Sequence, residues 1–220
     1  MLRQTKLKMN ILITGFEPFQ QDLTNPSWEI AKALNGLHIC HYHICTVCLP
    51  VVFGQAAQVL TQAIEAYKPD YVICLGVAAN RNAISLERVA INLDDARITD
   101  NAGNQPIDQA IDPQGSPAFF SGLPIKTIFQ KLQQNKIAVE VSNTAGTYVC
   151  NHVFYHLMSI IRQTHIKGGF IHVPALPEMV QSNGTAQGMD LNTQIQAIRL
   201  IIETTIQTQT DVKVVAGTIS

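Results

Sequence analysis

Residues 71–76 read YVICLG, an unbroken apolar run that stops at a glycine. A short continuous run of this kind is typical of a strand that is buried on both faces, as in a parallel sheet covered by helices. NILIT at residues 10–14 and GFIHV at residues 169–173 have the same character. The sequence therefore predicts a sheet whose central strands are buried.

Helical patterns alternate with these runs along the chain. Asn25-Pro26-Ser27 is typical of a helix start, because asparagine caps the first turn and proline fits the first helical position. We expect further helices at about 53–67, 123–135, 151–164 and 190–208, and further strands at 38–47, 85–92, 137–142 and 212–215. This alternation predicts an α/β fold, a single-domain α/β/α sandwich with a mostly parallel twisted sheet.

The charge balance limits the possible partners of the chain. Its 220 residues include 15 Lys and Arg against 16 Asp and Glu, with no basic run, which argues against nucleic acid and anionic membranes. Residues 33–64 carry no charged side chain apart from histidine, but their histidines, proline and glutamines argue against a membrane span. The five cysteines and the lack of an export signal predict free thiols and a cytoplasmic location.

We expect residues 1–8 to be an N-terminal extension and residues 9–220 to form one domain. Within it, the stretch from Asp94 to Pro117 is rich in glycine, proline and asparagine and predicts a long loop. A long irregular segment inside a compact domain is uncommon and often functional. Ligand sites in α/β folds lie beyond the carboxyl ends of the strands, so reactive groups are expected there.

Cys150 is the first residue whose position suggests chemistry. Val153, Leu157 and Ile161 form a helical stripe behind it, so the thiol lies at or just before a helix N-terminus. The positive end of a helix lowers the pKa of a thiol, and the thiolate is the nucleophilic form. The alternative is a buried structural cysteine, which is the commoner role of a free thiol.

His172 is the second such residue, at the exit of the strand predicted at 169–173. A neutral imidazole there could take the thiol proton and later protonate an amine leaving group. The alternative is a hydrogen-bonded histidine of the core. His152 is nearer to Cys150 in sequence but is a poor base for it, because residues two apart on a helix do not face each other.

Glu87 is the third. Alternation along residues 85–92 places it on one face with Val89 and Ile91, where a carboxylate needs a partner such as an imidazole N–H. It would then orient the histidine, which is the third role of a catalytic triad. The alternative is an ordinary ion pair with Arg88 or Arg97.

Residues 38–48, HICHYHICTVC, resemble a metal-binding segment but offer one C-x2-C pair and no second half-site. Strand alternation also divides these side chains between two faces. We therefore expect no metal, with a zinc-binding protein as the alternative. A phosphate-binding loop and the HExxH and GxSxG motifs are absent, and no strand is followed by GxGxxG, which argues against the common nucleotide, zinc-protease and serine-hydrolase classes.

Four blocks carry a resemblance to a known family: ITGFEPF with NPSWEIAKAL (13–34), LERVAINLDDARITDNAGNQPID (86–108), SNTAGTYVCNHVFYHLM (142–158) and GGFIHVPALPEM (168–179). From about Met9 onward the chain resembles the pyroglutamyl peptidase I family, in order and in spacing. The resemblance implies a cytosolic cysteine peptidase that removes an N-terminal pyroglutamyl residue from peptides. It implies no metal or cofactor, and a homotetramer or homodimer.

The resemblance also implies roles for single residues. Cys150 matches the family's nucleophile, His172 its base and Glu87 the carboxylate that orients the base. Arg97 matches an arginine beside the oxyanion. The side chains expected to contact the substrate are Phe16, Phe19, Val77, Tyr148 and Val149.

Some positions depart from the family pattern. Gln20 and Gln21 stand where the family usually has two glycines, Val77 where it has glutamine, and Val51 where it has threonine. These positions flank the substrate slot in the family. A related cysteine amidase with another acyl specificity is therefore one alternative, and a catalytically silent α/β binding protein is another.

Overall fold

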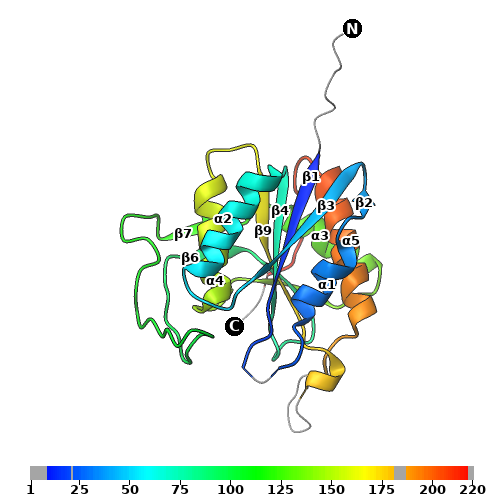
Figure 1. Ribbon diagram of the computed structural model, residues 1–220. Coiled ribbons are helices and arrows are strands. Elements are labelled where there is room, and N and C mark those ends of the chain that lie inside the picture. Colours follow the sequence, from blue (N-terminus) through cyan, green and yellow to red (C-terminus); the bar gives the residue numbers. More distant parts are fainter. Residues whose placement is uncertain (1–8, 21, 181–186, 218–220) are drawn as a thin grey trace.

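The computed structural model describes residues 9–20, 22–180 and 187–217 (Figure 1). Residues 1–8, expected to be an extension, and Gln21 lie outside the described residues. A seven-stranded sheet has the order β2-β3-β1-β4-β9-β5-β8. Its strands are β1 (Asn10–Phe16), β2 (His38–Ile39), β3 (Tyr42–Leu49), β4 (Tyr71–Val77), β5 (Ile84–Glu87), β8 (Val139–Ser142) and β9 (Lys167–Val173).

The sheet is mostly parallel, as expected. β3, β1, β4 and β9 run side by side in one direction, and β5 is parallel to β8. Two pairs are antiparallel, β2 with β3 and β5 with β9. β5 therefore runs against the central strands, which brings Ser85 opposite His172.

Five helices and one short 3-10 helix surround the sheet: α1 (Pro26–Leu34), α2 (Gln55–Tyr67), α3 (Ile125–Gln134), α4 (Val149–Ile161), α5 (Leu191–Gln207) and η1 (Pro177–Met179). α1, α3 and α5 pack on one face of the sheet, and α2 and α4 pack on the other (Figure 1). Each face has its own apolar core, so the expected α/β/α sandwich is confirmed. No helix in the described part of the chain is long and apolar enough to cross a membrane.

The helix starts follow from local sequence. Asn25 caps α1 through a hydrogen bond from the Ser27 N–H, with Pro26 at the first helical position, as predicted. Asp190 caps α5 in the same way, accepting from the Thr193 N–H. α4 differs, because no side chain caps it and its N-cap residue is Tyr148. The free N–H groups of its first turn are therefore available to a ligand.

Three predicted strands differ from the structure. Residues 38–47 are interrupted at Cys40 and His41, whose left-handed φ values of 47° and 74° form the turn between β2 and β3. Residues 85–92 do not form one strand. The chain leaves the main sheet at Arg88, and β6 (Val89–Ile91) pairs with β7 (Ala118–Phe120) in a separate two-stranded sheet.

The strand predicted at 212–215 is wrong, since these residues pair with no strand and Val215 is 98% exposed. The physical reason lies at Asp211, just before them. Its carboxylate accepts hydrogen bonds from the Lys126 and Thr127 N–H groups, and so holds the chain at the start of α3. The segment therefore does not extend the sheet at the β8 edge.

Candidate active site

Cys150 is the second residue of α4, so the predicted position at a helix N-terminus is confirmed. Val149, Val153, Leu157 and Ile161 are buried along one side of the helix and fix it against the sheet. The Sγ atom lies against Gly76 in β4. A Cβ atom built on Gly76 would stand only 2.9 Å from this Sγ, so the glycine makes room for the thiol.

His172 and Glu87 form a buried pair. Nδ1 of His172 lies 2.8 Å from Oε1 of Glu87, and the two residues are 4% and 0% exposed. Because an ionised carboxylate can only accept, the imidazole donates its Nδ1–H. Nε2 then carries the lone pair, which is the form that a general base needs.

The thiol of α4 lies against β4, the strand next to β9, which carries the imidazole. Gly76, which holds the Sγ, is paired with His172 across β4 and β9. The ring of Phe170 lies 4.9 Å from the His172 ring and also reaches Gly76. Among the described residues no hydrogen bond links Sγ to the imidazole, an arrangement common in enzymes without substrate.

Burial, together with the nearby Glu87 carboxylate, raises the pKa of the Cys150 thiol to about 12, although the Arg81 guanidinium acts to lower it. The expectation that the helix start would lower this pKa is wrong, because desolvation outweighs the helix dipole here. The resting residue is therefore a thiol. Nucleophilic attack requires a base that takes its proton at the moment of reaction.

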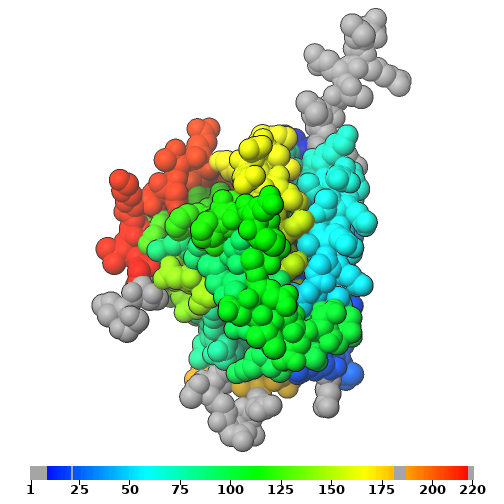
Figure 2. Space-filling view, turned by 90° about the vertical axis from the view of Figure 1, so that its left-hand side faces the viewer, coloured from blue at the N-terminus to red at the C-terminus, as the bar shows by residue number. Residues whose placement is uncertain are grey.

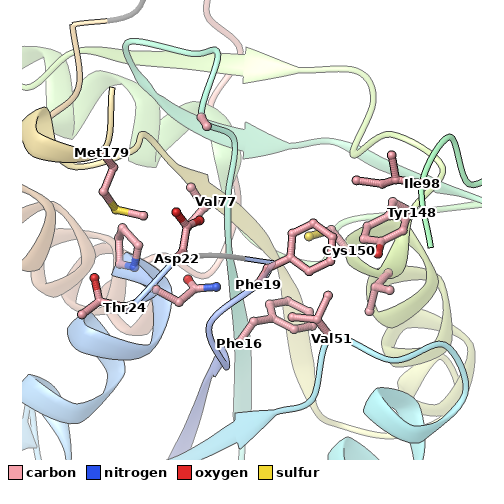
Figure 3. Close-up of a pocket in the computed structure, with 14 residues that line it drawn as sticks. Phe16, Phe19, Asp22, Thr24, Val51, Val77, Ile98, Tyr148, Cys150 and Met179 are labelled. Atoms are coloured by element: carbon pink, nitrogen blue, oxygen red, sulfur yellow. The ribbon is translucent and has the colours of Figure 1, made fainter. Parts of the chain in front are cut away.

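A cavity of about 250 Å³ opens beside the thiol (Figure 3). Apart from Asp22, Thr24 and Asn25 its lining is apolar, and Phe16, Phe19, Val77, Tyr148, Val149 and Cys150 all belong to it. The ring of Tyr148 lies 5.7 Å from that of Phe19 and 5.2 Å from that of Phe53. The structure thus brings all five side chains expected at the substrate to the cavity that Cys150 also lines.

Arg97 is not brought to this cavity. Its side chain is exposed, whereas the next residue, Ile98, is part of the lining. The long loop that carries both is held at the start of α4, because the Tyr148 hydroxyl donates to the Thr99 carbonyl and the Thr147 hydroxyl donates to the Asp95 carbonyl. Figure 2 shows the loop, in green, spread across one face of the molecule beside cyan α2.

His152 is engaged elsewhere. Its Nδ1 lies 2.8 Å from Oδ2 of Asp94, and its Nε2 accepts the Gly54 N–H at 3.3 Å. Because Nε2 accepts from a backbone N–H, it carries no proton, and the ring proton is on Nδ1, which donates to Asp94. Both ring nitrogens therefore have hydrogen-bond partners. His152 therefore links α4, the long loop and the start of α2, in agreement with the expectation that it is not the base.

The sequence matches the family model described as pyroglutamyl peptidase over residues 9–208. The chain belongs to this family. A pyrrolidone-carboxylate peptidase of Bacillus subtilis is 46% identical over 97% of this chain and all of its own, and one of Ralstonia nicotianae is 46% identical over 94% and 97%.

Solved structures agree with this family membership. The crystal structure of pyroglutamyl peptidase I from Bacillus amyloliquefaciens has a TM-score of 0.89 and 42% identity, covering 93% of this chain and all of its own. A mutant pyrrolidone carboxyl peptidase of Pyrococcus furiosus has a TM-score of 0.86 and 40% identity, covering 90% and 99%. The α/β fold described above is thus the fold of the family.

The departures from the pyroglutamyl peptidase pattern lie at different distances from the thiol. Val51 and Val77 both line the cavity, so their side chains shape it directly. Gln20 is exposed and has a left-handed φ of 55°, a conformation that suits the glycine usual in the family. The departure at Gln20 therefore affects the backbone conformation, whereas the departures at Val51 and Val77 change the side chains that line the cavity.

Sequence reasoning missed two residues of this pyroglutamyl peptidase site. Asn151 is fully buried and binds the end of β6. Its side chain accepts a hydrogen bond from the Ile91 N–H and donates to the Ile91 and Leu93 carbonyls. Arg81 contacts Glu87, in place of the ion pair with Arg88 or Arg97 that was the alternative. The signal for Asn151 was its place one residue after the nucleophile, whereas Arg81 lies in an irregular segment with no periodicity.

The alternative of a zinc site gains no support. In residues 38–48, Nδ1 of His43 lies 3.3 Å from Sγ of Cys45, and the His38 and His43 rings are in edge contact. Across the described residues, no group of three or more His, Cys, Asp or Glu side chains could hold a metal ion.

Proposed function

We propose that Cys150, His172 and Glu87 are the nucleophile, base and orienting carboxylate with which this family member removes N-terminal pyroglutamyl residues from peptides. The observation that carries the proposal is the 2.8 Å contact between Glu87 and His172, with the thiol held over the adjoining strand at Gly76. A buried carboxylate, an imidazole and a thiol in this order are the parts of a cysteine-peptidase triad.

The reaction follows from these positions. Nε2 of His172 takes the Sγ proton of Cys150 while the sulfur attacks the pyroglutamyl carbonyl, and Glu87 stabilises the imidazolium that forms. The imidazolium then protonates the amine of the departing peptide, which leaves a thioester on the sulfur. Water, activated by the same imidazole, hydrolyses the thioester and regenerates the thiol.

The tetrahedral intermediate needs donors for its negative oxygen. The uncapped first turn of α4 offers backbone N–H groups beside the sulfur, and the helix dipole adds to their effect. Arg97 stays a prediction for the same role. Because its side chain is exposed in the structure, that role requires it to turn toward the cavity when substrate binds.

The cavity suits a pyroglutamyl group. This residue has no charged amine and carries a flat lactam ring, which an apolar slot with aromatic walls accommodates. Phe16, Phe19, Tyr148, Val149 and Val77 supply such walls next to the thiol (Figure 3). The ring N–H and carbonyl still need polar partners, which backbone groups near Gly76 can supply.

Hydrolysis of chromogenic anilides tests this function. We expect the protein to cleave a pyroglutamyl anilide and to lose this activity on alkylation with iodoacetamide or in Cys150→Ser. Cys48→Ser is the matched control, because Cys48 is also half-buried but does not line the cavity. Cleavage of alanyl or prolyl anilides but not of the pyroglutamyl one would favour the cysteine amidase, and cleavage of none would favour a silent binding protein.

We also propose that residues 9–220 form one catalytic domain, that the protein is cytoplasmic, and that it is a homodimer or homotetramer. None of the five cysteines forms a disulfide within the described residues, which suits a reducing compartment. Phe120 and Ile107 are 71% and 68% exposed and could be covered by a second copy. Light scattering of the purified protein measures the oligomeric state, and a monomer at micromolar concentration would contradict this part.

A further inference from the structure

Arg81 joins the catalytic carboxylate to the loop that leads into the nucleophile helix. It lies in the irregular segment between β4 and β5, and Nη1 is 2.8 Å from Oε1 of Glu87. Its Nη2 donates to the Thr144 carbonyl at 3.1 Å, six residues before Cys150. One planar guanidinium thus contacts both parts of the site at once, each through a different nitrogen.

The negative charge of the Glu87 carboxylate needs compensation, which the ion pair with Arg81 supplies. The carboxylate is fully buried, and both of its donors, Arg81 Nη1 and His172 Nδ1, meet the same oxygen, Oε1. The other oxygen, Oε2, is buried and has no hydrogen-bond partner in the part of the chain that the structure describes. A buried carboxylate stays ionised only when a cation or several donors compensate it.

His172 cannot supply that positive charge before the reaction, because the base must be neutral to accept the thiol proton. Two other titratable groups lie near the pair, and neither is a cation: Glu140 from β8, which contacts Arg81, and Cys150 from α4, which interacts with the charge of Glu87. Glu140 Oε1 lies 3.9 Å from Arg81 Nη1, and its side chain is 44% exposed, so this contact is weak. Within the described residues, Arg81 is the one permanent cation in contact with Glu87.

We propose that Arg81 is a positioning residue of the active site, which acts through Glu87 and keeps it ionised beside a neutral His172. This inference rests on the proposed function. Arg81 does not line the cavity, so it acts on the rate of the chemistry and not on the binding of the substrate.

The consequence for pH follows from the charges. Without Arg81, the negative charge of Glu87 is compensated when the imidazole takes up a proton, and the base is then blocked. Arg81 and a protonated His172 are like charges that meet the same Glu87 oxygen, so removal of the guanidinium favours protonation of the imidazole, by about one pH unit or more. The acidic limb of the kcat/KM profile therefore moves to higher pH when the guanidinium is removed.

The test measures kcat, KM and their pH profiles on a pyroglutamyl anilide for Arg81→Gln, Arg81→Lys and Arg88→Gln. For Arg81→Gln we expect the acidic limb of the kcat/KM profile to shift to higher pH by about one unit. We also expect kcat at neutral pH to fall about 10- to 100-fold with little change in KM. Arg81→Lys restores the charge and returns the limb toward that of the wild type. Arg88→Gln removes the arginine that follows Glu87 in sequence, whose side chain forms no ion pair with Glu87 among the described residues, and should behave as wild type.

An acidic limb of folded Arg81→Gln that coincides with the wild-type limb would overturn the inference, as would a limb of Arg81→Lys displaced as far as that of Arg81→Gln. Thermal unfolding shows whether each variant is folded. If Arg81→Gln does not fold, the inference is tested by comparing kcat of Glu87→Gln with kcat of the double variant Arg81→Gln/Glu87→Gln. With both partners of the ion pair neutral, we expect kcat of the double variant to match that of Glu87→Gln within about threefold, and a further large loss would contradict action through Glu87.

These outcomes separate the inference from the function on which it rests. If wild-type protein cleaves the pyroglutamyl anilide and Cys150→Ser does not, the proposed function stands whatever Arg81 does. If the wild type has no such activity, the proposed function fails before Arg81 is tested.

Discussion

The substitution Gly76→Ala, which adds one methyl group, tests the position of the Cys150 thiol. In Gly76→Ala the new Cβ atom would stand 2.9 Å from Sγ of Cys150 and 2.9 Å from two ring atoms of Phe170. Nonbonded atoms attract each other at about 3.5–4.0 Å, so the sulfur or the ring must retreat by about 0.6 Å or more. The backbone itself tolerates alanine, because the φ of Gly76 is not left-handed.

A displacement of this size has a large effect on catalysis. Misplacement of a reacting group by about 1 Å costs roughly 100-fold in rate, so we expect kcat/KM of Gly76→Ala on a pyroglutamyl anilide to fall by about this factor. Overpacking of a buried site also costs about 1–3 kcal/mol of the free energy of unfolding. The activity and the stability must therefore be measured together, by steady-state kinetics and by denaturant unfolding.

Gly169→Ala is the matched control. Its Cβ atom would clash with the Ser121 hydroxyl and stand 2.8 Å from two side-chain atoms of Leu123, and these three nearest atoms include none of Cys150. We expect a comparable loss of stability but near wild-type activity per folded molecule. Equal activity losses in the two variants, or full activity in Gly76→Ala, would refute the position of the thiol against β4.

Three further predictions follow from the same structure. His172→Ala should abolish turnover, whereas His152→Ala should lower stability and leave residual activity, and kinetics with the reverse order would show that the base has been misassigned. Val77→Gln should change kcat/KM on a pyroglutamyl anilide little, because the lactam is held by backbone groups, and a large gain in the variant would show that a side-chain donor is needed. Burial raises the pKa of the Cys74 thiol to about 12, so the folded state keeps a proton that the unfolded state loses above about pH 9. This contribution to stability is complete below pH 9 and is lost as the pH rises toward 12, by up to about 1.4 kcal/mol per unit; Cys74→Ala should flatten the fall of the unfolding free energy between pH 9 and 11, and parallel curves for the two proteins would contradict the shift.

Much of the fold could be predicted because the decisive strands are buried on both faces. β1, β4 and β9 appear in the sequence as uninterrupted apolar runs, and such runs have few other places in a globular domain. The break at Arg88 could not be predicted, because alternation continues through it while the chain passes from one sheet to another. The sequence around Val215 resembles a strand, but strand formation needs an open sheet edge, and Asp211 holds the chain elsewhere.

The positions of the candidate site residues could be predicted where they lie at the ends of helices and strands. Cys150 at a helix start and His172 at a strand exit follow from periodicity, and the face of Glu87 follows from alternation. The rise of the thiol pKa could not be predicted, because it depends on how deeply the packed helix buries the sulfur. Arg81 could not be predicted either, since its reach to Glu87 is set by an irregular segment.

The central claim is that Cys150 forms the thioester with the pyroglutamyl group, and trapping this intermediate tests it most directly. Rapid acid quenching of the protein during turnover of an activated pyroglutamyl ester, followed by peptide mapping with mass spectrometry, locates any acyl group. We predict one pyroglutamyl group on the peptide that contains Cys150, and none in Cys150→Ser. An acyl group on another residue, or normal turnover by Cys150→Ser, would contradict the account.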